Sequence, residues 1–415
     1  MKTCSEMKTC SEIKTCSEIK TELSKFSGQE VNYVHEFLAH TKGQKSWSQM
    51  LEEAISEKLA VNFAIACNSG TSALHMAMAA IGIKKGDEVI VPGLTVVMDA
   101  YAVIHMGATP VFADVNPDTY TIDPLDIKRK ITKKTKAIIT VSLQGLFADM
   151  DPIIEIAKKH KIYVVDDSAQ NLMGKYKGNF AGTLGDISIL SFENKKHMTS
   201  GSEGGMLLTN NEKFAVNARK FGGIGYKHMT AKAGRTSLAL SSVQDPNYER
   251  FDTVGLNYRM PEICAAVGLA QFERIEEIVT KRQKVARLFS HAVIDCNWIK
   301  PQLIPIDYLH SHYTFSFEFL GLEKFGMTWK DFYNLYTEAG GDGFYSACVV
   351  PYLEPVFKNS NNKKLKLIST LNHCPVAEDL QKKIMQFKTN YRSLEEAENK
   401  ANILKKVIDK IGRVK

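Results

Sequence analysis

The feature that most constrains the fold of this chain is an alternation of short apolar segments with helix-like segments. The apolar segments are rich in β-branched residues and show little polar alternation, which is typical of strands buried on both faces. They occupy residues 88–92, 110–115, 137–143, 162–169 and 187–192, with 204–209 as a further candidate. This order predicts an α/β fold with a doubly wound, mostly parallel sheet that binds ligands at the carboxyl ends of its strands.

Helix signals lie between and after these strands. Residues 71–82 form an Ala-rich run that stops at a glycine, and Asp151-Pro152 suits the first turn of another helix. From residue 261 to 289 the pattern predicts one long helix that bridges two lobes. Beyond it the rhythm is more mixed, and residues 312–320 predict a strand.

The length of 415 residues indicates more than one lobe. Residues 1–24 open with a short repeat, KTCSE followed by Met or Ile, that matches neither a helical nor a strand period. We expect this segment to be a disordered tail. A large domain is expected over residues 25–275, followed by a smaller α+β domain over residues 276–415.

Composition argues against several classes of protein. Apolar residues at 44% and charged residues at 24% are ordinary for a globular chain, and no run of about 20 apolar residues could span a membrane. The formal charge of +7 is not accompanied by a basic stripe interleaved with aromatic residues, which argues against nucleic acid as a binding partner. Scattered cysteines without zinc spacing and the lack of a secretory h-region lead us to expect a cytoplasmic protein without a metal site.

Three segments carry candidate chemistry. The first is ACNSGTSALH, residues 66–75, in which Ser69, Gly70 and Thr71 precede the Ala-rich helix. A helix N-terminus offers unpaired backbone N–H groups and a positive dipole end, so it suits a phosphate group. The same three residue types cap many helices that bind nothing, so this segment is weak evidence by itself.

The second segment is VVDDSAQ, residues 164–170, which puts two acidic residues at the end of a buried strand. Buried carboxylates need partners, and a helix cap would satisfy one at most. The other, Asp167, could pair with a protonated ring nitrogen, as pyridoxal phosphate requires when it acts as an electron sink. Gln170 is close enough in sequence to contact the phenolic oxygen of that cofactor.

The third segment is SFENKKHMTSGSEGG, residues 191–205, which follows a predicted strand. Most Lys-Lys pairs are solvated surface charges. A lysine at the ligand edge of the sheet could instead form a Schiff base with the cofactor and then move a proton for the substrate. Phosphate loop, acidic ring partner and strand-end lysine occur here in the order Ser69–Thr71, Asp167 and Lys196, which strengthens each signal.

Together these segments resemble the DegT/DnrJ/EryC1/StrS family of pyridoxal-phosphate-dependent sugar aminotransferases, which have fold type I. The resemblance runs from about Phe37 into the C-terminal lobe. It is carried by NSGTSAL, GDEVIVPGLT, GATPVFADVNPDTYTID, ADMDPI, VVDDSAQ, SFENKK with EGG, and GLNYRMPEICAAVGLAQ. It implies pyridoxal 5'-phosphate as the cofactor and a homodimer with shared active sites.

The resemblance also implies the residues that hold the cofactor. Gly70, Thr71 and Ser191 would contact its phosphate. Asp167 would pair with the ring nitrogen, and Gln170 would contact the phenolic oxygen.

Three further positions follow from the resemblance. Asn257 and Arg259, in GLNYRM, would reach the cofactor of the partner subunit. Val96 stands where the family usually has an aromatic ring, and we expect this branched side chain to cover the cofactor ring with a weaker contact. A C-terminal substrate-pocket stretch of the family is replaced here by MQFKTNY, residues 385–391.

The resemblance leaves two possible positions for the residue that anchors the cofactor. Counting forward from Ser191 puts it on Lys196, whereas counting backward from Glu203 puts it on His197, since this chain has one extra residue before EGG. We favour Lys196, because the strand sets the forward count and a loop absorbs an insertion more easily. Lys195 would then point to solvent. Histidine in this position resembles the related sugar 3-dehydratases, in which no Schiff base to the protein forms.

The function that follows is transfer of an amino group from an amino acid, glutamate in this hypothesis, to a keto sugar linked to a nucleotide. Such a reaction belongs to amino-sugar and surface-polysaccharide biosynthesis. Lys196 and Asp167 are the predicted catalytic residues. One alternative is a pyridoxal-phosphate-dependent keto-deoxysugar 3-dehydratase that uses His197. Another is a non-catalytic regulatory protein of the same fold.

Overall fold

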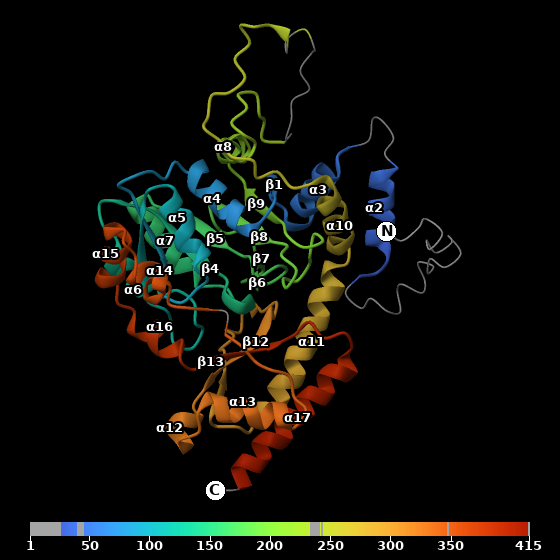
Figure 1. Cartoon of the computed structure of the whole chain (residues 1–415), viewed down its shortest axis with the longest axis vertical. Helices are drawn as coiled ribbons and strands as arrows, with labels where there is room; N and C mark the ends of the chain where they lie inside the picture. Colours follow the sequence, from blue (N-terminus) through green and yellow to red (C-terminus); the bar gives the residue numbers. More distant parts are fainter. Residues whose placement is uncertain (1–25, 40–44, 233–240, 242–243, 347, 414–415) are drawn as a thin grey trace, which may run out of the picture.

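The structure, a computed structural model, describes residues 26–39, 45–232, 241, 244–346 and 348–413. The tail predicted at residues 1–24 lies outside these ranges. A domain built on a large sheet forms the upper part of the molecule in Figure 1, and a smaller domain lies below it. Within the described ranges, no helix is both long enough and apolar enough to cross a lipid bilayer.

The central sheet confirms the predicted doubly wound, mostly parallel arrangement. Its seven strands have the order β1-β9-β8-β5-β4-β2-β3. Their bounds are β1 (Phe63–Cys67), β2 (Glu88–Pro92), β3 (Thr109–Ala113), β4 (Thr135–Val141), β5 (Tyr163–Asp167), β8 (Ile187–Ser191) and β9 (Gly205–Thr209). Strand β9 is antiparallel to both neighbours, whereas β8, β5, β4, β2 and β3 run parallel.

Strand β1 is absent from the strands predicted from the sequence. Its FAIAC run contains two alanines, which have low strand propensity and weaken the signal. Because β1 and β8 both pair antiparallel with β9, the carboxyl ends of β1, β4, β5 and β8 lie along the same edge of the sheet.

Helices of the large domain are α2 (Gln29–Leu38), α3 (Trp47–Leu59), α4 (Gly70–Ala80), α5 (Met98–His105), α6 (Pro124–Lys130), α7 (Met150–His160), α8 (Glu212–Gly222) and α10 (Glu262–Phe272). Helices α4 and α7 correspond to the two predicted between strands. Helix α4 packs against α5 and α8, and α10 packs against α2 and α3. Buried apolar side chains of these helices and of the sheet form the cores beneath these groups.

The single long helix predicted over residues 261–289 is wrong. The structure has α10, then a break, then α11 (Ile275–Val293). Arg274 has a non-helical backbone, with φ −106° and ψ 11°, and its guanidinium pairs with Glu277 in the first turn of α11. Helix α10 is apolar around most of its surface because it packs between other helices, whereas α11 is amphipathic. The two helices therefore have different environments.

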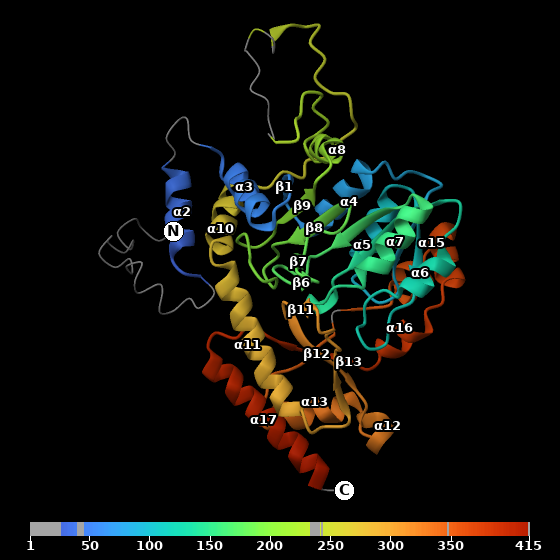
Figure 2. The ribbon, with the colours of Figure 1, turned by 180° about the vertical axis from the view of Figure 1, so that it is seen from behind.

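The smaller domain has a three-stranded antiparallel sheet in the order β10-β12-β13. Its main elements are β10 (Ile299–Pro301), β12 (Thr314–Phe319), α12 (Gly321–Phe325), α13 (Trp329–Glu338), β13 (Ile384–Lys388) and α17 (Leu394–Arg413). Helices α11 and α17 pack side by side, as Figure 2 shows. Stacked rings of Phe289, Phe317 and Phe387 lie in the core. The strand predicted at 312–320 corresponds to β12.

The chain returns to the large domain between residues 348 and 384. This segment contains η4 (Pro351–Leu353), α14 (Pro355–Lys358), α15 (Lys363–Leu371) and α16 (Pro375–Leu380). Several of its buried side chains, such as Tyr352 and Phe357, share a core with Phe112 of β3. A boundary near residue 275 therefore does not describe all of the packing, since part of the C-terminal third belongs with the first core.

Candidate active site

The start of α4 and the end of β8 meet at the ligand edge. The hydroxyl of Ser69 caps α4 by accepting a hydrogen bond from Ser72 N at 3.0 Å. A Cβ atom on Gly70 would lie 2.9 Å from Ser191 Cβ, and one on Gly205 would lie 2.5 Å from the carbonyl oxygen of Ser69. Thr71 is exposed in the first turn. The sequence therefore folds into a cradle of backbone N–H groups and hydroxyls, which fits a phosphate group.

The two acidic residues at the end of β5 point to opposite faces, as successive residues of a strand do. Asp166 accepts hydrogen bonds from Ser168 Oγ at 2.7 Å and Thr140 Oγ1 at 3.4 Å. Asp167 is 3% exposed, and its Oδ1 accepts from Ala169 N at 2.8 Å. Neither carboxylate caps a described helix, so Asp166 is held by local hydroxyls and Asp167 remains available to a ligand.

Lys196 lies in the turn after β8. Its backbone N–H donates to Glu193 O at 2.9 Å, and its Nζ lies 4.8 Å from the centre of the Tyr313 ring. Burial lowers the pKa of the Lys196 amine, and the neighbouring carboxylates of Asp167 and Glu193 oppose that shift. The amine is therefore an electrostatic neighbour of Asp167, with a larger neutral fraction than an exposed lysine has.

The two neighbours of Lys196 point elsewhere. Lys195 is exposed and lines a cavity of about 260 Å³ together with Arg282, Tyr313 and Lys388. His197 is buried, and its Nε2 lies 3.2 Å from Ser311 O. Burial and the charge of Arg282 hold the pKa of His197 well below its usual value. Of the three side chains, the structure places the amine of Lys196 beside Asp167.

Gln170 is buried, and its Oε1 accepts a hydrogen bond from Gln144 N at 2.7 Å. Gln144 belongs to η3 (Leu143–Gly145), which follows β4, and it has a left-handed backbone with φ 63°. Its side-chain Oε1 is buried without a partner in the described part of the chain. Gln144 is not among the site residues predicted from the sequence, although its position just after a buried strand is a signal for the ligand edge.

Val96 lies half-buried in the turn between β2 and α5. The residue before it, Thr95, pairs its backbone with Val349 at 3.0 and 2.9 Å. The hydroxyl of Thr95 donates to Asp99, a fully buried carboxyl group that the sequence analysis did not assign to the site. A charged residue inside the apolar run 96–108 was the signal that could have found it.

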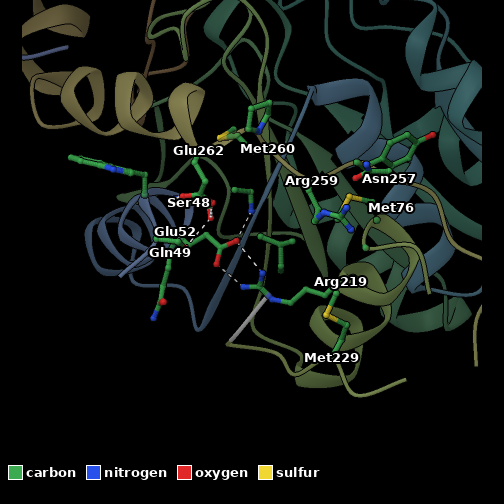
Figure 3. Close-up of a pocket in the computed structure, with 18 of the residues that line it drawn as sticks. Ser48, Gln49, Glu52, Met76, Arg219, Met229, Asn257, Arg259, Met260 and Glu262 are labelled. Atoms are coloured by element: carbon green, nitrogen blue, oxygen red, sulfur yellow. Dashed lines mark hydrogen bonds and ion pairs between the residues drawn. The ribbon is translucent and has the colours of Figure 1, made fainter. Parts of the chain in front are cut away.

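Asn257 and Arg259 lie elsewhere, along a cavity of about 670 Å³ (Figure 3). Their backbones form antiparallel bridges with Gly223 and Cys67. Neither Asp167 nor Lys196 lines this cavity. Asn257 is exposed and Arg259 is half-buried, so both side chains lie at the molecular surface rather than within the Lys196 site.

The wall of the large cavity contains a buried ion pair. Glu52 of α3 accepts two hydrogen bonds from Arg219 of α8, at 3.0 and 2.7 Å (Figure 3). Next to it, Ser48 donates to Glu262 of α10 at 2.6 Å. These contacts join α3, α8 and α10 around the cavity. None of the residues in them belongs to the Lys196 site.

A phosphate cradle at a helix start, a buried carboxylate and a neighbouring amine along one edge of a doubly wound sheet define a pyridoxal-phosphate enzyme of fold type I. Comparison with known proteins agrees with that class. The chain belongs to the DegT/DnrJ/EryC1/StrS aminotransferase family, whose sequence model matches residues 24–404.

Two relatives and one solved structure illustrate this membership. The GDP-perosamine synthase of Caulobacter vibrioides is 40% identical over 264 residues, which cover 63% of this chain and 66% of that enzyme. The UDP-2-acetamido-2-deoxy-3-oxo-D-glucuronate aminotransferase of Pseudomonas aeruginosa is 37% identical over 57% of this chain and 60% of that enzyme. An aminotransferase structure from Psychrobacter cryohalolentis superposes with a TM-score of 0.81 at 27% identity, covering 92% of this chain and 96% of that one.

Proposed function

We propose that this chain transfers an amino group from glutamate to a keto sugar carried on a nucleotide, in the biosynthesis of amino sugars for surface polysaccharide. The observation that carries the proposal is the buried Lys196 amine on which the charge of the buried Asp167 carboxylate acts, at the ligand edge of the sheet. Family membership and the named relatives support the substrate class.

The residues present fit pyridoxal phosphate. Gly70, Thr71 and Ser191 would hold its phosphate at the start of α4, where a Cβ on Gly70 would fill the space. Gln170 would contact its phenolic oxygen, and Val96 would cover its ring. When bound, the cofactor supplies an aldehyde that reacts with amines and a ring that withdraws electrons.

The protein's own part of the chemistry is proton handling. The Lys196 Nζ would carry a proton between substrate carbon and cofactor, because burial lowers its pKa and gives the amine a larger neutral fraction that can accept one. Asp167 would stay ionised opposite the ring nitrogen, so that the ring keeps its positive charge. Tyr313 lies under the amine and would exclude water from that side.

The dehydratase alternative is less well supported. It requires His197 at the cofactor, but the His197 ring is buried against Ser311 O and close to Arg282. A regulatory protein without catalysis would not need a buried amine near a buried carboxylate.

The partner subunit also belongs to the proposal. We propose a homodimer in which Asn257 and Arg259 reach the partner's cofactor; their location along a surface cavity supports this. The division into a large domain (25–275) and a small domain (276–415) stays a prediction. The described cysteines are free, which supports a reducing, cytoplasmic setting.

Borohydride reduction of the enzyme loaded with pyridoxal phosphate, followed by peptide mapping, tests the cofactor site. We expect the label on Lys196; bound cofactor that cannot be trapped would favour His197 chemistry. A second assay would follow glutamate-dependent amination of GDP- and UDP-linked keto sugars. No turnover with any nucleotide-linked keto sugar, in an enzyme labelled on Lys196, would overturn the substrate class alone.

A further inference from the structure

We propose that Asp99 and Asp167 form a carboxylic acid–carboxylate pair, in which Asp99 keeps a proton and holds Asp167 as an oriented anion. The role of Asp167 toward the cofactor ring rests on the proposed function, whereas the pair itself rests on geometry. Asp99 is a positioning residue in this proposal, since it acts through Asp167.

Asp99 is in the first turn of α5 and is 0% exposed. Its Oδ2 accepts a hydrogen bond from Thr95 Oγ1 at 2.6 Å. Its Oδ1 has no N–H or O–H donor in the described part of the chain. The group that this carboxyl does contact is Asp167, at hydrogen-bonding range. One oxygen of Asp99 thus has a hydroxyl partner, the other oxygen lacks a donor, and the carboxyl group as a whole meets that of Asp167.

Two carboxylates in contact inside a protein cannot both ionise without a large electrostatic cost. One shared proton turns the same contact into an O–H···O⁻ hydrogen bond, which is stronger than a neutral one. The proton belongs on Asp99, because Asp167 already accepts the backbone N–H of Ala169 at 2.8 Å, and that donor stabilises its ionised form. Burial and the charge of Asp167 raise the pKa of Asp99 well above its usual value.

The remaining titratable groups near the pair agree with this assignment. The amine of Lys196 approaches from the turn after β8, with Glu193 beside it, and the thiol of Cys348 approaches from the segment after the small-domain helices. Burial raises the pKa of Cys348 to about 11, so the thiol is neutral. With Asp99 protonated, Asp167 carries the negative charge of the pair, and the Lys196 amine is its electrostatic neighbour.

The consequence is a fixed orientation for Asp167. Ala169 and Asp99 hold its carboxylate from two sides, and the remaining acceptor positions are free for a ring N–H. Asp99 therefore prevents Asp167 from rotating and keeps it ionised when a ligand displaces water from the site.

The pair can be tested by the pH dependence of unfolding. Asp99→Asn keeps the shape and offers an amide donor to Asp167 but carries no titrating proton. The folded wild-type chain retains a proton that the unfolded chain releases. The ratio of the wild-type unfolding constant to that of the variant should therefore rise as the pH rises. The expected change is about tenfold per pH unit above pH ~4. Urea unfolding of the full chains between pH 5 and 8 would measure the ratio; a flat ratio overturns the pair.

Asp166→Asn is the matched control, since Asp166 is the buried neighbour on the opposite face of β5. Burial raises the pKa of Asp166 to about 6. Its effect on the pH dependence of the unfolding constant should therefore end near pH 6, whereas the effect of Asp99 should continue above that pH. If the ratio for Asp99 also levels near pH 6, the proton is not retained at neutral pH and the proposal fails.

The positioning role is tested by cofactor affinity. Asp99→Asn should change the dissociation constant for pyridoxal phosphate by less than about 3-fold, and Asp99→Leu should weaken binding about tenfold through loss of one charged hydrogen bond. Wild-type affinity in Asp99→Leu would overturn the positioning role. If wild-type protein binds no pyridoxal phosphate, the proposed function fails, while the unfolding experiment still decides whether the pair exists.

Discussion

The buried guanidinium of Arg282, on α11, donates a hydrogen bond from Nη2 to the backbone carbonyl of Lys196 at 2.8 Å. Nη2 also lies 3.4 Å from the carbonyl of Lys195, while Nη1 donates to Tyr313 O and Thr389 Oγ1, both at 3.1 Å. In the described part of the chain no carboxylate pairs with Arg282, and burial lowers its pKa to about 10. The small domain thus holds the turn that presents the lysine.

Arg282→Met should loosen this turn. Losing hydrogen bonds from a charged donor to buried acceptors should cost about 2–3 kcal/mol of folding stability. Amine misplacement should lower kcat by about 100-fold. Urea unfolding and steady-state kinetics would measure both. Arg287→Met, on the same helix but exposed to solvent, is the control. Equal effects of the two changes would contradict the bracing role.

Lys196→Ala should lower transamination by at least about 1,000-fold, because the chain loses both its anchor and its proton carrier. Lys195→Ala should retain most activity, since that side chain is exposed and faces the 260 Å³ cavity. Single-turnover kinetics with glutamate would separate the two variants. Full activity in Lys196→Ala would show that the anchor lies elsewhere.

Gly70→Ala should weaken cofactor binding. The added Cβ would lie 2.9 Å from Ser191 Cβ, which is closer than side chains pack, so the cradle must widen. We expect the dissociation constant for pyridoxal phosphate to rise about tenfold, a cost of about 1.4 kcal/mol. Gly70→Ala with Ser191→Gly removes the clash. Ser191→Gly alone is the reference, because it removes a hydroxyl assigned to the phosphate. If Gly70→Ala weakens binding as much in the Ser191→Gly background as in the wild-type background, crowding is not the cause.

A histidine pair, the buried His310 and the half-buried His312, should make the fold sensitive to acid. The rings of His310 and His312 stack at 4.0 Å, and burial lowers the pKa of His312 to about 4. The unfolded chain binds a proton at this residue near pH 6.5 and the folded chain does not. Stability is therefore lost as pH falls from about 6.5 toward 4.

Replacing His312 with Phe keeps a ring and removes that proton. Between pH 7 and pH 5 the variant should lose about 2 kcal/mol less unfolding free energy than wild type. Denaturant titrations at the two pH values would measure the difference. His160→Phe, at an exposed position of α7, is the control. Identical losses in wild type and His312→Phe would rule out this source of acid sensitivity.

Much of the architecture and the order of the site could be predicted from short stretches of sequence. Buried parallel strands are apolar along their length, so β2, β4, β5 and β8 stand out without knowledge of their neighbours. The residues before α4 and at the end of β5 indicate a phosphate site and an acidic partner, because these positions must lie at the ligand edge of such a sheet. The weak strand β1, rich in alanine, lacked this signal.

Tertiary structure decided what local patterns could not. Local sequence does not decide which of three consecutive side chains, Lys195, Lys196 or His197, lies near Asp167. That depends on the conformation of their turn, which Arg282 of a distant helix holds through hydrogen bonds to its backbone. Asp99 meets Asp167 across the sheet edge although 68 positions separate them in the chain (167 − 99). Strand periodicity is a short-range property and can be read from the sequence. Side-chain partners across a folded edge depend on packing between distant segments, and only the assembled structure determines them.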